Sequence, residues 1–294
     1  MEFRLSARMF SGPLGPWLRL MRFDRPIGLA LLLWPTWWGL WFAAGGLPQL
    51  DNLLIFSLGV VVMRAAGCVI NDYADRDLDP KVTRTRQRPL ACGEIRPAHA
   101  LVLFFVLMFI ALGLVLLTNR LTVLLAIGGA MLAGSYPFLK RFTHFPQLGL
   151  GTAFSWAILM GFAAETGTIP VQAWWLFAAN LIWTVIYDTQ YAMADREDDL
   201  KIGVKSTAIA FGRLDVPIIA GLMGLFLATL VLIGVQFLPT PAWFTAVVLV
   251  FLLLQMQLWR IRSRAPAACF QAFLSNHWVG LVIFLGIVVS FARA

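Results

Sequence analysis

The sequence predicts an all-α integral membrane protein, a bundle of about nine transmembrane helices with two internally repeated halves. Of the 294 residues, 60% are hydrophobic and only 13% are charged, which is more apolar surface than one water-soluble core can bury. The apolar residues form repeated runs close to the ~20 residues with which a helix crosses the hydrocarbon. These runs lack the alternation of polar and apolar residues that a membrane β-barrel wall requires.

The expected spans follow one another along the whole chain. They cover residues 27–46, 53–72, 98–118, 121–138, 147–165, 171–191, 216–236, 242–259 and 276–292. Pro35 and Pro137 are expected to kink or end their helices, because proline lacks a backbone donor and crowds the preceding turn. We expect a single membrane-embedded domain over 1–294, with most Trp and Phe side chains facing lipid or the interfaces.

The distribution of basic residues predicts the orientation. Most of the 23 Lys and Arg residues lie before the first span or in the loops that follow the even-numbered spans. The opposite side shows only Arg120 and Arg293. Since basic loops remain in the cytoplasm, the segment 1–26 and the loops after the second and sixth spans are expected there, with the C-terminus outside. The net charge of +8 reflects this asymmetry and does not indicate a nucleic-acid surface.

The N-terminal segment lacks the short hydrophobic stretch of a cleaved signal peptide. We therefore expect an uncleaved, multi-pass protein of a bacterial inner membrane. The mitochondrial inner membrane is the alternative, because the segment is rich in Arg.

Two acidic stretches, within residues 71–79 and 188–199, lie at the ends of expected spans. They form an internal repeat, in which Asp75-Arg-Asp-Leu-Asp79-Pro-Lys81 aligns with Asp195-Arg-Glu-Asp-Asp199-Leu-Lys201. Each stretch also continues a polar stripe with the same helical spacing. The stripes are Arg64, Asn71 and Asp75, and Asp188, Asp195 and Asp199. Carboxylates at this depth are unfavourable unless they have a function.

Closely spaced carboxylates repel one another unless a divalent cation lies among them. Ligands that offer only oxygen favour Mg²⁺, which often shares its coordination shell with substrate phosphates. The basic loop at residues 81–89 supplies groups that bind phosphate directly. A diphosphate between two acidic clusters satisfies both observations, and an organic part inside the bilayer must be a lipid. The three Cys and three His residues are far apart, which argues against a disulfide or a zinc site.

The motifs resemble those of a known family. Asn71-Asp72-x-x-Asp75-x-x-x-Asp79, followed by Arg84-Thr85 and Arg88-Pro89-Leu90, resembles the first signature of the UbiA superfamily of intramembrane prenyltransferases. Tyr187-Asp188-Thr189-x-Tyr191-Ala192-x-x-Asp195-x-x-Asp198-Asp199, followed by Gly203-x-Lys205-Ser206-Thr207, resembles the second. The likeness covers most of the chain and is greatest to the branch that prenylates 4-hydroxybenzoate in ubiquinone biosynthesis. Asp77 is a variable spacer in the pattern.

The resemblance implies a reaction in which Mg²⁺ and basic side chains withdraw charge from an allylic polyprenyl diphosphate until its C–O bond ionises. The carbocation then attacks the ring carbon ortho to the phenol hydroxyl, and a proton leaves. The implied partners are the polyprenyl diphosphate, 4-hydroxybenzoate and the lipid bilayer.

The same resemblance suggests residue roles. The expected metal ligands are Asn71, Asp72, Asp75 and Asp79 for one ion and Asp195, Asp198 and Asp199 for the other. Asp72, Asp75, Asp188 and Asp195 are the expected catalytic carboxylates, and Asp188 is a candidate to orient or deprotonate the phenol. Arg84, Arg88, Lys201 and Lys205 are expected to bind the diphosphate, and Arg64, Lys140 and Arg141 are alternatives for the acceptor carboxylate.

Other interpretations remain open at this stage. The acceptor could be a naphthoate, haem or a chlorophyll precursor. A cation transporter would place its acids near the membrane midplane, whereas all but Asp188 lie at the cytoplasmic ends of spans. Arg64 could form a structural pair with Asp188 or Asp75, and Lys140 and Arg141 could serve only topology.

Overall fold

The computed structural model describes residues 12–81 and 85–292, apart from the side chains of Lys81, Tyr136, Pro137 and Lys140. Within these ranges the regular structure is entirely helical. The long helices are α2 (Ile27–Ala44), α3 (Leu50–Asp75), α4 (Pro97–Val115), α5 (Arg120–Phe142), α6 (Pro146–Thr166), α7 (Val171–Ile202), α9 (Asp215–Phe237), α10 (Pro241–Ile261) and α12 (Asn276–Ala292). The short ones are α1 (Gly15–Leu20), η2 (Asp79–Lys81), α8 (Thr207–Phe211), η3 (Gly212–Leu214) and α11 (Pro266–Leu274).

Each expected span corresponds to one long helix, which confirms the predicted fold class. Among the described residues, seven helical segments are long and apolar enough to cross a membrane. The apolar part of α5, Arg120–Ser135, is shorter. Helix α7 extends past the expected end at residue 191 to Ile202, and Gly203 ends it in the left-handed conformation, with φ of 72°. The second acidic motif is therefore the last part of a helix and not a loop.

Neither proline ends its helix. Pro35 lies inside α2, and Thr36 next to it donates from its hydroxyl to the Leu32 carbonyl at 2.8 Å. Helix α5 continues through residue 137 to Phe142.

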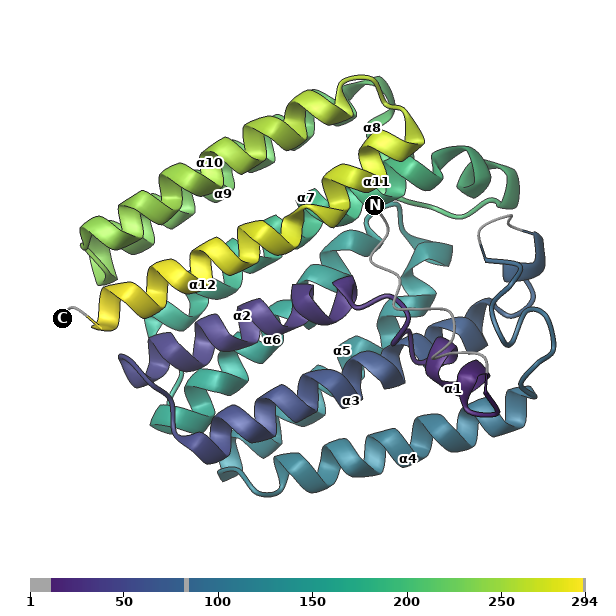
Figure 1. Cartoon of the computed structure of the whole chain (residues 1–294), viewed down its shortest axis with the longest axis horizontal. Coiled ribbons are helices and arrows are strands. Elements are labelled where there is room, and N and C mark those ends of the chain that lie inside the picture. The colour runs from purple at the N-terminus through teal and green to yellow at the C-terminus, as the bar shows by residue number, and fades with distance from the viewer. Residues whose placement is uncertain (1–11, 82–84, 293–294) are drawn as a thin grey trace.

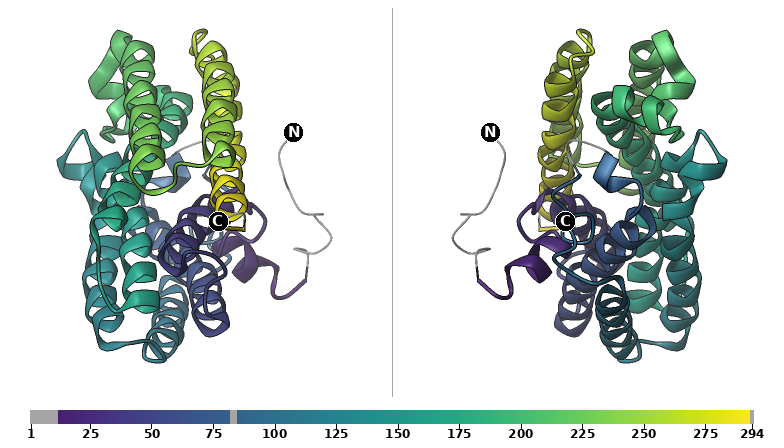
Figure 2. Two further views of the ribbon diagram at one scale, coloured as in Figure 1. Left: turned by 90° about the vertical axis from the view of Figure 1, so that its left-hand side faces the viewer. Right: turned by 90° about the vertical axis from the view of Figure 1, so that its right-hand side faces the viewer.

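The long helices lie side by side in three groups (Figure 1). Helices α2, α6 and α7 occupy the middle, α3, α4 and α5 lie on one side, and α9, α10 and α12 lie on the other. The loops that follow α3 and α7 project from the same end of the bundle, opposite the end that carries the C-terminus (Figure 1). Seen from the two ends, the purple α2 and α3 face the teal α5 and α6 (Figure 2). The two acidic motifs thus reach the same end of the molecule.

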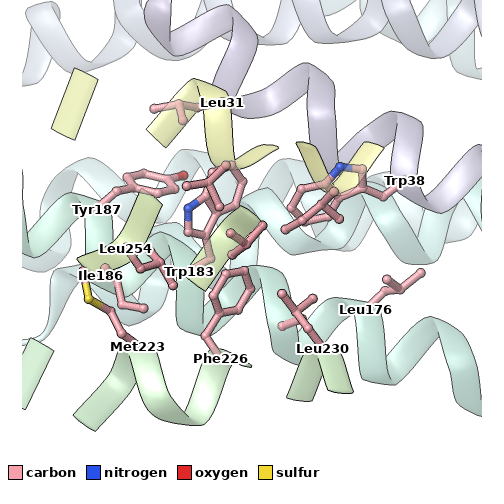
Figure 3. Packing of buried hydrophobic residues seen from close by; sticks show 14 of the residues in the cluster. Leu31, Trp38, Leu176, Trp183, Ile186, Tyr187, Met223, Phe226, Leu230 and Leu254 are labelled. Carbon is pink, nitrogen blue, oxygen red and sulfur yellow. The ribbon is translucent and has the colours of Figure 1, made fainter. Parts of the chain in front are cut away.

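Among the described residues, most Trp and Phe side chains are not buried, but several pack in the core around α7. Trp183 lies 5.2 Å from Tyr187, 5.3 Å from Trp38 and 6.5 Å from Phe226 between ring centroids (Figure 3). The Trp183 indole N–H donates to the Asn276 Oδ1 at 2.9 Å. A buried tryptophan needs such a partner, so this hydrogen bond helps to fix how α7 packs against α12.

Candidate active site

A cavity of about 750 Å³ begins among the motif-bearing ends of α3 and α7 and extends into the bundle. Both acidic motifs line it, although they are far apart in the sequence. The predicted residues that line the cavity are Arg64, Asn71, Asp72, Asp75, Asp79, Arg88, Asp188, Asp195, Asp198, Asp199 and Lys205. The two polar stripes therefore face the same space, as their helical spacing predicts.

Helix α3 ends at Asp75, so its last turns carry the first motif to the mouth of the cavity. Asp72 and Asp75 are buried, and Asp79 follows at the first residue of η2. The Thr85 hydroxyl donates to the Asp79 carbonyl at 2.9 Å, and the Arg88 backbone N–H donates to the Thr85 carbonyl at 2.9 Å. These bonds hold the basic loop against the acidic motif.

Two arginines neutralise the first motif. The Arg22 Nη2 donates to both carboxylate oxygens of Asp72, at 2.7 and 3.0 Å. The Arg88 Nη1 donates to Asp79 at 2.9 and 3.0 Å and lies 3.1 Å from the Asp72 Oδ1. Hydrogen bonds between such charged groups are stronger than neutral ones. Arg22 also lines the cavity, whereas its position before the first expected span indicated only a role in topology.

The electrostatics of this loop follow from its burial. Burial raises the pKa of the Asp79 carboxyl, and the neighbouring Arg88 only partly offsets that effect. Burial alone would lower the pKa of Arg88, but Asp72 and Asp79 outweigh it and raise the pKa. Arg88 is therefore held as a cation between two carboxylates, next to the place where an anion would enter.

The second motif is braced by polar contacts from neighbouring helices. Gln147, at the start of α6, hydrogen-bonds the Asp188 carboxylate. The Gln147 Oε1 also accepts from the Thr207 backbone N–H at 3.1 Å. The hydroxyls of Thr189 and Thr207 lie 2.7 Å apart. These contacts tie α6, α7 and α8 together beneath Asp188. Gln147 was not predicted as a site residue, although a polar side chain at the start of an otherwise apolar span could have indicated it.

Arg64 lines the cavity from inside α3. A Cβ at Gly28 would lie 2.4 Å from the Arg64 Nη2, so a larger residue at position 28 would displace the guanidinium from its present position. Throughout residues 12–81 and 85–292, no carboxylate lies within salt-bridge distance of Arg64. The alternative in which Arg64 forms a structural pair with Asp188 or Asp75 is therefore wrong in this structure.

Two predicted binding residues lie outside the cavity lining. The Lys201 Nζ is 3.3 Å from the Asp198 Oδ1 at the surface. The Arg141 Nη2 donates to the Ala74 carbonyl at 2.7 Å, and its guanidinium lies over the Phe138 ring at 5.7 Å. Arg84 and the Lys140 side chain lie outside the described part of the chain. Arg141 thus braces the end of α3 instead of facing the cavity.

The donor set of the cavity fits Mg²⁺ in kind. In the described part of the chain, no three His, Cys, Asp or Glu side chains form a preassembled metal cage. Asp72 and Asp79 are instead paired with Arg22 and Arg88. Carboxylate and amide oxygens nevertheless line the cavity from both motifs. Mg²⁺ is commonly bound by one or two protein carboxylates together with waters and substrate phosphates, so a complete protein cage is not required.

The helices and the cavity define an integral membrane protein with an acidic and basic site at one end of its bundle. Residues 32–285 match the profile of the UbiA prenyltransferase family. The chain belongs to this family.

Several bacterial relatives are similar over nearly their whole length. The chain is 58% identical over 276 residues to a 4-hydroxybenzoate octaprenyltransferase of Ectopseudomonas mendocina (strain ymp). The matched residues cover 94% of this chain and 93% of the relative. It is 54% identical over 274 residues to a 4-hydroxybenzoate octaprenyltransferase of Azotobacter vinelandii (strain DJ / ATCC BAA-1303), with 93% of each chain covered.

Solved structures share the fold. The apo structure of a UbiA homologue from Aeropyrum pernix K1 superposes with a TM-score of 0.79 and 21% identity, covering 89% of this chain and 97% of that one. A UbiA homologue from Archaeoglobus fulgidus bound to GPP and Mg²⁺ superposes with a TM-score of 0.76 and 18% identity, covering 95% of this chain and 100% of that one.

Proposed function

We propose that the protein transfers a polyprenyl group from an allylic polyprenyl diphosphate to the ring carbon ortho to the hydroxyl of 4-hydroxybenzoate, a step of ubiquinone biosynthesis. The observation that carries the proposal is one cavity lined by both acidic motifs and by Arg88, Lys205 and Arg64. Relatives more than half identical to this chain are 4-hydroxybenzoate octaprenyltransferases, and this similarity supports the choice of acceptor.

In this proposal Arg88 and Lys205 bind the diphosphate at the mouth of the cavity. Arg88 exchanges its contacts with Asp72 and Asp79 for the incoming phosphate oxygens, which frees Asp79 and leaves Asp72 paired with Arg22 alone. Asn71, Asp72, Asp75 and Asp79 on one side, and Asp195, Asp198 and Asp199 on the other, would then hold Mg²⁺. When bound, Mg²⁺ supplies charge that stabilises the departing diphosphate.

The chain's own residues orient the reaction. Arg64 binds the acceptor carboxylate, because its guanidinium lines the cavity and has no carboxylate partner among the described residues. Asp188, which Gln147 holds in place, orients or deprotonates the phenol. The C–O bond of the allylic carbon breaks and releases diphosphate. A C–C bond then forms between that carbon and the ring, and the ring carbon loses its proton.

We place the site on the cytoplasmic side of a bacterial inner membrane. The basic loops after α3 and α7 support this orientation, because they surround the mouth of the cavity. Apart from Asp188, the described acids that line the cavity lie at or just beyond one end of α3 and α7, which favours a prenyltransferase over a cation transporter.

The proposal is tested with the purified protein in lipid, a polyprenyl diphosphate, radiolabelled 4-hydroxybenzoate and Mg²⁺, beside an EDTA control. Metal-dependent transfer of label into the organic phase is the expected result. Transfer to other aromatic acceptors but not to 4-hydroxybenzoate would move the protein to another branch of the family. An absence of metal-dependent transfer to any acceptor would overturn the enzyme assignment.

A further inference from the structure

Outside the cavity, arginines gather where η3 meets the turn that follows α10. The Arg264 Nη2 in that turn donates to the Arg213 carbonyl of η3 at 2.9 Å, so the two segments are in direct contact. Arg260 lies in the last turn of α10, and Arg262 follows the helix. The side chains of Arg213, Arg260 and Arg262 are exposed and do not line the cavity, and we call them the arginine patch. Figure 1 shows the turn after α10 at the same end of the bundle as the loops that follow α3 and α7.

The backbone that carries the arginine patch is held in place. Asp215 at the start of α9 is buried and accepts hydrogen bonds from Arg196 of α7 and from the Arg264 Nε, the latter at 2.9 Å. The Arg264 backbone N–H donates to the Ile261 carbonyl at 3.0 Å, and Arg264 adopts a φ of 53°. A residue other than glycine keeps that conformation only where its surroundings require it. A turn that is already ordered loses less conformational entropy when its side chains bind a ligand.

The protein does not balance the charge of the arginine patch. In the segments 207–217 and 256–270, which meet here, the only acidic residue is Asp215, and two other arginines already neutralise it. Within the described part of the chain, no carboxylate lies at salt-bridge distance from any side chain of the patch. Three exposed guanidinium groups therefore remain for an anion from outside the chain.

Membrane topology alone does not explain this arrangement. The rule that basic loops stay in the cytoplasm counts residues in each loop and does not depend on where the folded chain places them. Here Arg213 comes from the connection between α7 and α9, and Arg262 from the connection between α10 and α11. Folding brings the two loops together, and the nearby carboxylate of Asp215 is withdrawn into the interior. The result is one continuous cationic surface instead of two separate loop charges.

Apolar neighbours place the arginine patch at the depth of lipid headgroups. Trp259 directly precedes Arg260 and is 71% exposed. Met256 and Leu252, one and two turns farther into α10, are 50% and 51% exposed and share one face of the helix with Trp259. Tryptophan is typical of the boundary between the bilayer and water. The patch therefore lies where the lipid-facing surface of α10 ends.

We propose that the arginine patch binds the phosphate of an anionic phospholipid, such as phosphatidylglycerol, in the leaflet on the side of the acidic motifs. Guanidinium groups match phosphate oxygens in bidentate geometry, and the acyl chains lie against the exposed face of α10. Each arginine near an anionic surface raises the binding constant about fivefold, so three together raise it about 100-fold. This site goes beyond the proposed function, because it requires neither the prenyl diphosphate nor the acceptor.

Thermal unfolding in a neutral detergent tests the site with added lipid. Phosphatidylglycerol should raise the melting temperature of the wild type more than phosphatidylcholine does. Glycerol phosphate, which offers the same phosphate without acyl chains, should leave the melting temperature unchanged at the same concentration. A shift with glycerol phosphate equal to that with phosphatidylglycerol would identify a site for soluble anions and overturn the assignment to lipid.

Two triple variants with the same loss of net charge locate the effect. The first combines Arg213→Gln, Arg260→Gln and Arg262→Gln, and its apparent dissociation constant for phosphatidylglycerol should rise about tenfold or more. The control replaces three exposed arginines outside the patch and should bind as the wild type does; it combines Arg86→Gln, Arg96→Gln and Arg120→Gln. Wild-type affinity in the first variant overturns the proposal. Equal losses in both variants also overturn it, because net charge alone would then explain the binding.

The first triple variant could fail to insert, because it removes charges from two loops. Arg262→Lys and Arg262→Gln then decide the question. Lysine keeps the charge that sets topology but lacks the planar fork of the guanidinium, so Arg262→Lys should bind phosphatidylglycerol more weakly than the wild type and more tightly than Arg262→Gln. Wild-type affinity in Arg262→Gln contradicts the proposal.

Hydrogen exchange on the wild-type protein locates the site without any substitution and does not depend on turnover. Phosphatidylglycerol, compared with phosphatidylcholine, should slow exchange of the backbone amides in residues 211–216 and 260–267. Unchanged exchange in both segments contradicts the proposal. A protein that shows this protection but transfers no prenyl group retains the lipid site and loses only the proposed function.

Discussion

Arg88 connects the basic loop to the first acidic motif, through contacts with Asp72 and Asp79. We expect Arg88→Ala to lower kcat/KM for the prenyl diphosphate by roughly 10- to 100-fold, because it removes a charge-assisted hydrogen bond to the phosphate. Steady-state kinetics with varied diphosphate measures the effect. Arg86→Ala is the matched control, since Arg86 lies in the same loop but is exposed and outside the cavity lining. Equal losses in both variants would mean that only the net charge of the loop matters.

Asp75 and Asp77 give a second comparison between neighbouring carboxylates. Asp75 is 4% exposed and lines the cavity, whereas the Asp77 side chain is 82% exposed. Asp75→Asn should lower turnover about a hundredfold and raise the Mg²⁺ concentration needed for half-maximal rate, because a carboxylate facing the metal has become neutral. Asp77→Asn should change neither quantity. A Mg²⁺ titration of both variants measures this, and identical titration curves for Asp75→Asn and wild type would remove Asp75 from the metal site.

At the residue scale, the sequence predicted most of the charged residues that line the cavity, because spacing along a helix determines which side chains share a face. Arg64, Asn71 and Asp75 were predicted to share one face of α3, and all three line the cavity. Arg22 was missed, because its partner Asp72 is fifty residues away and local spacing carries no signal for that contact. Arg141 was one of three candidates for the acceptor carboxylate, but its side chain donates to the Ala74 carbonyl. That contact depends on how α5 packs against α3, which local sequence does not reveal.

At the scale of the helices, a buried carboxylate outside the cavity holds the end of α7 in place. Asp215, at the start of α9, accepts hydrogen bonds from Arg196 of α7 and from the Arg264 Nε, the latter at 2.9 Å. Arg264 also donates to the Arg213 carbonyl at 2.9 Å and adopts a positive φ of 53°. The three residues Asp215, Arg196 and Arg264 form a triad that joins α7, α9 and the loop after α10.

Asp215→Asn should therefore destabilise the protein, since it leaves two guanidinium groups without their buried counter-charge. Both arginines are partly exposed, so we expect a loss of about 2 kcal/mol, below the full value for a completely buried pair. Thermal unfolding in detergent measures the change. Lys201→Gln, which breaks the exposed pair with Asp198 on the same helix, should lower stability by about 0.5 kcal/mol or less. Equal shifts in melting temperature would show that the triad has no special structural role.

The sequence predicted the long elements well because apolar run length and flanking charge determine where a membrane helix begins and ends. The short helices α1, α8 and α11 were not predicted, since segments of this length form through tertiary packing and not through periodicity. The position of Trp183 in the core was also missed. Hydropathy does not distinguish an aromatic ring that faces lipid from one that packs between helices, and the hydrogen bond to Asn276 becomes visible only in the structure.

In the whole molecule, the mouth of the cavity and the connection between α4 and α5 lie at opposite ends of the bundle. Figure 1 shows this arrangement, with the loop after α3 at one end and the α4–α5 turn at the other. The cavity is lined by charged residues at one end and by apolar residues farther in, so under the proposed function the diphosphate would enter from the charged end. The orientation predicted from the basic loops makes that end cytoplasmic.

Two cysteine positions test this orientation directly. Cys92 is exposed in the loop after α3, whereas Cys68 and Cys269 are buried and can be replaced by alanine to remove background. Leu117 lies at the opposite end of the bundle and is 73% exposed. The matched variant carries Leu117→Cys together with Cys92→Ser, so that its cysteine at position 117 is the one available for labelling. A membrane-impermeant maleimide should label Leu117→Cys but not Cys92 in spheroplasts, and Cys92 but not Leu117→Cys in inverted vesicles. The reverse pattern would place the acidic motifs outside the cell. Cytoplasmic Mg²⁺ and a prenyl diphosphate made in the cytoplasm could then not reach them, and the proposed reaction would lose its supply of substrate.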